Sequence, residues 1–103
     1  MKAFELLSDR SKWLQRMYAR DANGNSTFSE SDNACSWCTI GAINMAYLGG
    51  RQVTIENSAK REAAIRLLTS AIRPLGFDTI PQWNDAPGRT YEEVVETLRK
   101  LDI

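Results

Sequence analysis

The chain has 103 residues, of which 43% are hydrophobic and 25% are charged, and its thirteen basic and thirteen acidic side chains cancel. This composition predicts one globular domain over residues 1–103, excludes wholesale disorder, and argues against non-specific binding to nucleic acid. The chain contains no histidine, which excludes Ser-His-Asp and Cys-His catalysis and every histidine metal site. No cationic start precedes an apolar run, so we expect no signal peptide and a cytoplasmic protein.

The first predicted element is a helix ending at about Arg20, or two short helices hinged near Ser8. Its apolar residues recur at helical spacing: Phe4, Leu7, Leu14 and Tyr18. On such a helix Lys12, Arg16 and Arg20 would lie one turn apart and share a face. The pattern predicts a modest basic ridge that could dock an acidic partner.

A polar loop follows at residues 21–32. Its first, third and fifth residues are Asp, Asn and Asn, which is the ligand spacing of an EF-hand calcium loop. Ser26, however, stands where that loop needs a glycine, and Asp32 stands where it needs a bidentate glutamate. We therefore favour a polar turn over a calcium site, and we expect no metal.

The uncharged stretch 33–50 is the segment around which the chain is organised. We predict a central helix over about 33–48, apolar almost all round and therefore buried almost all round. Gly49 and Gly50 supply its stop. The stretch is shorter and more polar than the ~20 apolar residues of a membrane span, so we expect no membrane association.

Two cysteines, Cys35 and Cys38, stand three residues apart near the start of this helix. A helix N-terminus can lower a thiol pKa, but the strand–helix–strand context of thioredoxin-like chemistry is absent from the pattern. Two cysteines without histidine also fall short of four zinc ligands. We interpret both thiols as small apolar packing groups.

The rest of the chain predicts two more helices. Residues 52–55 resemble a short extended piece, and Asn57 or Ser58 then caps a helix that runs to about Arg73. A long ordered loop spans residues 77–89, and Thr90 opens the last helix in a capping box with Glu93. The predicted fold class is all-α, a compact bundle of four to five helices around the buried central helix.

The loop 77–89 carries the most interesting group of residues. Trp83, Asn84 and Asp85 could form a pocket rim, with Arg89 as an anion donor at the start of a helix. Alternatively, Trp83 closes the core while Asn84 and Asp85 hold the turn through bonds to the backbone. The structural interpretation is the stronger, because short amides and carboxylates bond locally so often.

The motif Ser-Trp-Cys-Thr-Ile-Gly-Ala, followed ~40 residues later by Trp-Asn-Asp and a short amphipathic helix, resembles a family of small proteins from bacteria and their phages. The resemblance spans most of the chain, and it rests on these residues: Trp37, Cys38, Gly41, Ala42, Trp83, Asn84 and Asp85. It implies a helical Trp-Cys-x-x-Gly-Ala motif and a Trp-Asn-Asp loop, and it carries no assigned activity.

These patterns favour a non-enzymatic helical module that binds a protein partner, with no cofactor and no nucleic acid. The family context extends this expectation to a phage-encoded inhibitor of a host defence machine, such as an anti-CRISPR factor. The alternative is a small-molecule or nucleotide binder, or an enzyme, that uses the Trp83-Asn84-Asp85 loop and Arg89. The basic residues Lys12, Arg16 and Arg20 complete the predicted binding groups, and the oligomeric state is left open.

Overall fold

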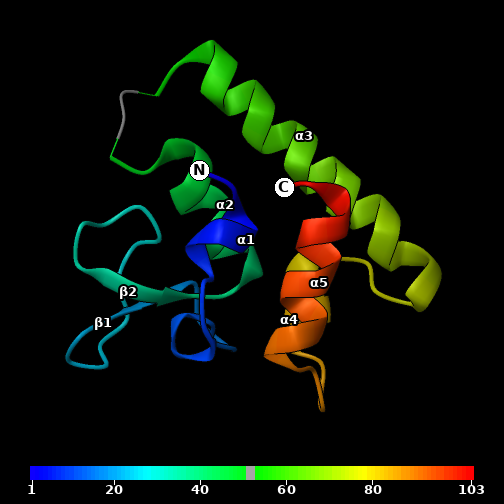
Figure 1. The fold of residues 1–103 in the computed structure, drawn as a ribbon, viewed down its shortest axis with the longest axis horizontal. Helices are drawn as coiled ribbons and strands as arrows, with labels where there is room; N and C mark the ends of the chain where they lie inside the picture. Colours follow the sequence, from blue (N-terminus) through cyan, green and yellow to red (C-terminus); the bar gives the residue numbers. More distant parts are fainter. Residues whose placement is uncertain (51–52) are drawn as a thin grey trace.

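The computed structural model describes residues 1–50 and 53–103 (Figure 1). The helices are α1 (Ala3–Leu6), α2 (Thr39–Leu48), α3 (Ile55–Ile72), α4 (Ile80–Asn84) and α5 (Tyr91–Leu101). The strands are β1 (Ala19–Asp21) and β2 (Ala34–Trp37), and two 3-10 turns are η1 (Arg10–Lys12) and η2 (Arg73–Leu75).

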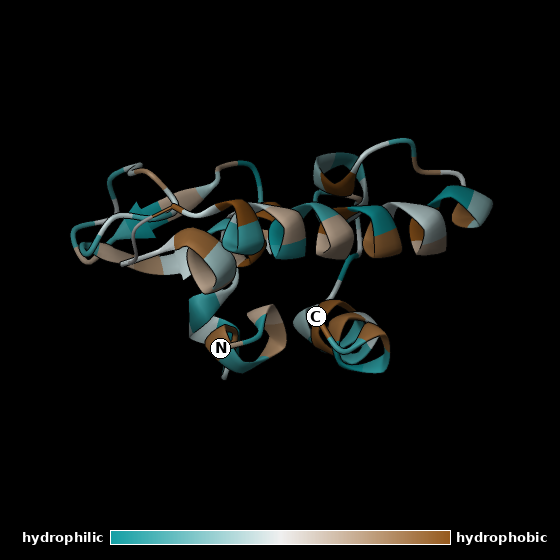
Figure 2. Ribbon diagram, turned by 90° about the horizontal axis from the view of Figure 1, so that it is seen from above, coloured by the Kyte–Doolittle hydropathy of each residue, from teal (hydrophilic) through white to brown (hydrophobic). Residues whose placement is uncertain are grey.

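The elements form a flat molecule of 34 × 33 × 20 Å. The ribbon of β1 and β2, α2 and α3 make its central layer, and α1 and α5 lie together on one side of that layer (Figure 2). The two termini are neighbours, since the amide of Ala3 donates to the carbonyl of Ile103 at 2.8 Å. One hydrophobic core runs through all five helices and the ribbon.

Our prediction of an all-α bundle is wrong. β1 and β2 pair as an antiparallel two-stranded sheet, so the fold is mixed α/β with five helices among the described residues. β2 occupies residues that we assigned to the start of the central helix, because Trp37 packs into the core from a strand. The indole of Trp37 donates to the carbonyl of Ser29 at 2.9 Å, which holds the loop before β2 against the ribbon.

The predicted N-terminal helix is also broken into pieces. Asp9 accepts a hydrogen bond from the amide of Ser11, and this local bond caps the short turn η1 in place of a helix. Leu14 then donates its amide to the carbonyl of Trp37 at 3.1 Å, which draws the segment beside β2. Arg16 has a φ of 72°, a left-handed conformation that a helix cannot pass through.

The central helix is shorter than predicted, and five of its ten residues are buried, so it is not buried all round. α2 begins at Thr39, and Cys38 caps it by accepting from the amide of Gly41 at 3.4 Å. It packs against α3, α1, α4 and β2, and its buried residues are these: Thr39, Gly41, Ala42, Ile43 and Ala46.

The C-terminal half follows the sequence more closely. α3 is capped by Thr54 and begins earlier than expected; the predicted extended piece at 52–55 lies partly outside the described residues, and Ile55 is already helical. The prediction of a long loop over residues 77–89 is wrong in part, because the capped helix α4 lies within it. The capping box of Thr90 and Glu93 at the start of α5 is confirmed.

Across residues 1–50 and 53–103, no helix combines the length and the apolar character that a membrane crossing requires.

Gly41 marks the closest approach in the core, and its neighbour is the ribbon, not a second helix. A Cβ atom at this position would overlap the backbone carbonyl of Tyr18, which accepts from the amide of Cys38 at 3.1 Å. We predict that Gly41→Ala lowers the free energy of unfolding by about 1–3 kcal/mol, although alanine is the better helix former. Urea unfolding measures this change.

The matched control for that variant is Ser70→Ala, at an exposed position of α3. It should leave stability unchanged or slightly higher. A Gly41→Ala protein as stable as the wild type would contradict the close approach.

Candidate functional site

The Trp-Asn-Asp motif lies on α4 and at its end. α4 forms because Thr79 and Gln82 make a capping box and Pro81 occupies its first turn, where proline needs no amide partner. Trp83 and Asn84 are in the helix, and Asp85 is the residue that closes it. The short helix therefore presents the three side chains from a defined backbone.

Asn84 is only 1% exposed, and its side-chain amide joins three parts of the chain. Its Oδ1 accepts from the indole of Trp13 at 2.8 Å, and from the amide and hydroxyl of Thr39 at 2.9 and 2.6 Å. Its Nδ2 donates to the carbonyl of Leu14 at 3.1 Å and to Asp85 at 2.9 Å. Asn84 thus caps the first amide of α2 from outside that helix and ties the N-terminal segment to it.

Asp85 holds the unusual turn at Arg16. Its Oδ1 accepts from the backbone amide of Arg16 at 2.9 Å as well as from Asn84. Gln15, next to Arg16, donates to the backbone carbonyls of Asn84 and Ala86 at 2.9 and 3.4 Å. The segment around Arg16 is thereby fastened to the end of α4 from both sides.

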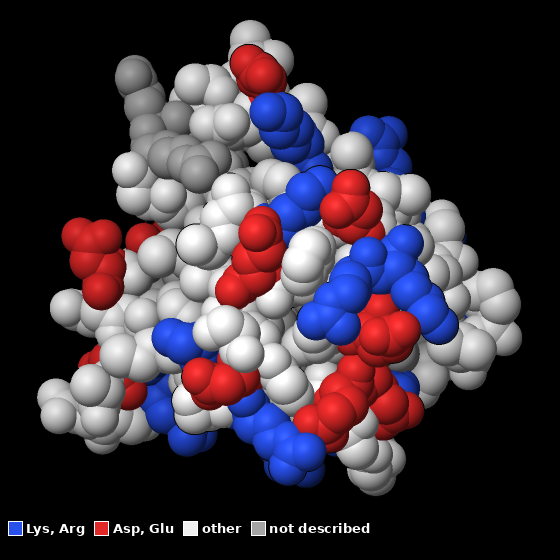
Figure 3. Space-filling model, viewed as in Figure 1, with Lys and Arg blue, Asp and Glu red and all other residues white. Residues whose placement is uncertain are grey.

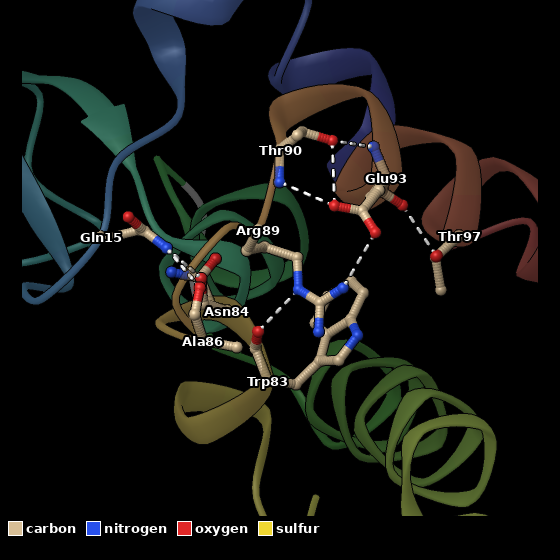
Figure 4. A network of polar contacts seen from close by, with 8 residues as sticks. All are labelled: Gln15, Trp83, Asn84, Ala86, Arg89, Thr90, Glu93 and Thr97. Carbon is tan, nitrogen blue, oxygen red and sulfur yellow. Dashed lines mark hydrogen bonds and ion pairs between the residues drawn. The ribbon is translucent and has the colours of Figure 1, made fainter. Parts of the chain in front are cut away.

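Trp83 is buried, and Arg89 covers its ring (Figure 4). The guanidinium lies 4.9 Å from the centre of the Trp83 ring and 5.4 Å from that of Phe77. Its Nε donates to the carbonyl of Trp83 at 2.9 Å, and its Nη1 pairs with Glu93 at 3.3 Å. We predicted Arg89 as a hydrogen-bond donor to a bound anion. In the structure its guanidinium is instead engaged by the Trp83 ring, the Trp83 carbonyl and Glu93.

Cys38 and Asp85 meet at a small pocket of about 190 Å³. Its walls are these residues: Arg16, Met17, Tyr18, Cys38, Pro81 and Asp85. Burial raises the pKa of the Cys38 thiol, and the Asp85 carboxylate adds to the rise, against the opposing effect of the amides of Gly41 and Ile40. The thiol is therefore protonated at neutral pH, the reverse of an activated nucleophile.

The other cysteine, Cys35, is exposed on β2, and both thiols are free. In the loop 21–32, Asp21 accepts from the amides of Asn23 and Asn25 at 2.9 Å each, which is the bonding of a polar turn. The part of the chain that the structure describes holds no group of three or more acidic or cysteine side chains arranged for a metal.

The three basic residues expected on one helical face come from different elements. Lys12 lies in η1, Arg16 in the loop that follows and Arg20 in β1. None of them takes part in an ion pair within residues 1–50 and 53–103. On the side of the molecule shown in Figure 3, positive and negative side chains are intermixed.

A surface that we did not predict from the sequence lies on the outer face of the ribbon. Ser26 bridges to Arg20, and Thr27 donates to the carbonyl of Ala19 at 3.1 Å, so continuing this register places Phe28 opposite Tyr18. Phe28 is 85% exposed and Tyr18 is 57% exposed. We call these two residues with Arg20 and Ser26 the ribbon face.

The ribbon face borders two depressions. Tyr18 and Phe28 both line a hollow of about 420 Å³, and Tyr18 also lines the pocket beside Cys38. A lone phenylalanine in a polar loop gives no periodic signal, which is why the sequence did not reveal this surface.

Comparison with known proteins places the chain in a family without giving it an activity. A family model described as a family of unknown function (DUF6197) matches residues 1–101. No curated protein and no solved structure matches the chain.

The bonds of Asn84 generate a stability prediction. Replacing Asn84 by alanine would leave the indole of Trp13, the amide of Thr39 and the carbonyl of Leu14 without their partner inside the fold. Each unsatisfied group costs about 1–3 kcal/mol, so we expect the free energy of unfolding to fall by at least about 3 kcal/mol. Chemical denaturation followed by tryptophan fluorescence measures it.

The control is Asp85→Asn, which keeps an oxygen able to accept from Arg16 and Asn84. We expect it to change stability by less than about 1 kcal/mol. Equal destabilisation by the two variants would show that the network is not centred on Asn84.

The raised pKa of Cys38 generates a pH prediction. Above about pH 8.5 the unfolded chain loses the thiol proton while the folded chain keeps it, so stability falls as pH rises. Cys38→Ser retains a capping oxygen and lacks this titration, so its stability should fall less between about pH 8.5 and 10. Thermal melts at matched pH values measure the difference.

Cys35→Ser serves as the control because Cys35 is exposed. Its pH profile should follow that of the wild type. A Cys38→Ser profile identical to the wild type would rule out Cys38 as the source.

Proposed function

The chain belongs to DUF6197, a family of unknown function, so we propose its function from the residues exposed on its surface. In this proposal the protein is a small non-enzymatic module that binds an acidic protein partner through the ribbon face. The observation that carries the proposal is the adjacent pair of exposed aromatic side chains, Tyr18 and Phe28, around one hollow.

Aromatic side chains supply much of the affinity at protein interfaces. Single exposed apolar residues are common on any protein, whereas adjacent ones that border a depression are typical of binding surfaces. Tyr18 also brings a hydroxyl for a polar contact, which suits a surface that is wet in the free protein. The pairing of Arg20 with Ser26, continued by two residues, puts Tyr18 opposite Phe28, so little ordering is needed on binding.

The charge of the partner follows from the residues beside the aromatic pair. Arg20 stands two residues from Tyr18 and therefore on the same side of β1. Arg16 shares the neighbouring pocket with Tyr18. Both are exposed and unengaged by ion pairs within the described chain, so they complement acidic side chains at the rim of an interface.

The narrower form of the proposal is a phage-encoded inhibitor of a host defence machine, of the anti-CRISPR kind. Its support is the resemblance of the motif to small proteins from bacteria and their phages, together with the small size of the chain. In that form the acidic partner is a subunit of the defence machine, and binding of a purified subunit is its test.

A second candidate function is a small-molecule binder at the pocket beside Asp85. The hydrogen bonds of the described chain engage only Oδ1 of Asp85, which favours a ligand at the second oxygen. The volume of about 190 Å³ lies below the ~300–1,000 Å³ of ordinary ligand pockets, which weighs against a nucleotide. Loss of a bound ligand in the stable Asp85→Asn variant would favour this candidate over the first.

The first proposal is tested by quantitative capture from a lysate of the cells that encode the protein, followed by affinity measurements with the purified partner. We predict that the double variant Tyr18→Ser, Phe28→Ser weakens binding by at least about 100-fold, because hot-spot aromatics contribute about 2 kcal/mol or more each. Arg20→Glu should weaken binding most at low salt.

The control is Leu75→Ser, which removes another exposed apolar side chain, in η2 at the end of α3. It should bind as the wild type does. A double variant that keeps its fold and its affinity would reject the ribbon face as the binding surface.

A further inference from the structure

The pocket beside Asp85 brings two opposite charges to one small space. Arg16 and Asp85 both line it, and the backbone amide of Arg16 donates to Oδ1 of Asp85 at 2.9 Å. The exposed guanidinium of Arg16, however, forms no ion pair with Asp85 or with any other carboxylate of residues 1–50 and 53–103. A cation and an anion therefore border the pocket without pairing with each other.

The Asp85 carboxylate is oriented by the fold but only half used by it. Its Oδ1 accepts from the amide of Arg16 and from the side chain of Asn84, and no hydrogen bond of the described chain reaches Oδ2. Both oxygens of an ionised carboxylate accept hydrogen bonds. The half-buried Asp85 thus offers a positioned acceptor to a donor that the chain does not itself supply.

The backbone that carries the two charges is fixed before any ligand arrives. Gln15 donates to the carbonyls of Asn84 and Ala86 at 2.9 and 3.4 Å, which fastens the segment before Arg16 to the end of α4. Arg16 itself has a φ of 72°, a conformation that costs free energy in a residue other than glycine. A backbone held in this way keeps the ordering cost of binding low.

The rest of the pocket is small and largely apolar. Met17 and Pro81 line it, together with the Cys38 thiol, which stays protonated at neutral pH because burial raises its pKa. The volume is about 190 Å³. A cavity of ~150 Å³ holds one benzene molecule, so this pocket suits a ligand only slightly larger, with a short apolar part.

We propose that the pocket binds a small free α-amino acid as its zwitterion. Arg16 donates to the α-carboxylate, Oδ2 of Asp85 accepts from the α-ammonium group, and the side chain of the ligand lies against Met17 and Pro81. The guanidinium suits a carboxylate because it donates two parallel hydrogen bonds, and both contacts are strengthened by charge. This inference rests on the second candidate function, the small-molecule binder, and gives its ligand a chemical class.

The two charges also define what the pocket rejects. A carboxylic acid without an amine places a negative charge beside Asp85, and an amine without a carboxylate places a positive charge beside Arg16. A residue inside a peptide chain carries neither charge on its backbone. The small volume in turn excludes large aromatic side chains, so the ligand is an amino acid of about the size of alanine or valine.

The test is an NMR titration of the full ¹⁵N-labelled chain with L-valine at up to about 10 mM, a range that covers the Kd expected for so small a ligand, below about 1 mM. Saturable shifts should appear at the backbone amides of Arg16, Tyr18 and Cys38. Isovalerate lacks the ammonium group of valine and isobutylamine lacks its carboxylate, so each should bind at least about tenfold more weakly. L-Tryptophan should not bind in the pocket.

Two variants each remove one of the charges. Asp85→Asn retains an oxygen for the bonds from Arg16 and Asn84, and Arg16→Gln alters an exposed side chain. Each should weaken the binding of L-valine by at least about tenfold. The matched control is Arg66→Gln, at an exposed arginine of α3, and it should bind L-valine as the wild type does.

The outcomes separate this inference from the functions proposed above. Isovalerate or isobutylamine that binds in the pocket as tightly as L-valine would overturn the amino-acid class and leave the small-molecule binder standing. Absence of saturable shifts with L-valine, shifts confined to another part of the chain, or undiminished affinity in either folded charge variant would also overturn it. Asp85→Asn should still bind the protein partner of the ribbon face, so that proposal stands or fails independently.

Discussion

The fold depends on one buried carboxamide. Asn84 contributes five hydrogen bonds, and they join the N-terminal segment at Trp13 and Leu14, the start of α2 at Thr39, and Asp85. A buried amide is costly unless all of its groups are bonded, and here the donor and the acceptor halves are both used. Because Thr39, Leu14 and Trp13 lie 45, 70 and 71 residues from Asn84 along the chain, the network specifies one arrangement of α2, α4 and the N-terminal segment.

The sequence was most informative where structure is set by neighbours along the chain. The capping box of Thr90 and Glu93 joins residues three apart, and the helix that follows begins where the pattern placed it. The N-terminal segment shows the opposite case. Its apolar residues keep helical spacing, yet the bonds of Asp9 to Ser11 and of Leu14 to Trp37 favour a turn and an extended segment. Periodicity alone does not include such partners.

In the candidate site, too, the sequence indicated the residue types but not their contacts with distant segments. The motif residues Trp83, Asn84 and Asp85 stood out by type and order, but their partners Trp13, Thr39 and Arg16 come from distant segments that no spacing connects. Cys38 looked like a thiol at a helix N-terminus, where the dipole lowers the pKa. In the fold it is buried beside Asp85, and burial raises the pKa instead. The environment of an ionisable group is a property of the tertiary structure.

The distribution of polar and apolar groups between interior and surface bears directly on what the molecule can do. The side chains that could take part in chemistry are hydrogen-bonded to their neighbours or buried among them: Asn84, Arg89 and Cys38. Substituting them would therefore affect the stability of the fold first. The exposed aromatic side chains of the ribbon face do the reverse, because they add little to the stability of the fold while exposing area that water solvates poorly. Because these groups are engaged inside the fold, the residues left for specific contacts lie on the surface, and the binding surface that we propose is the ribbon face.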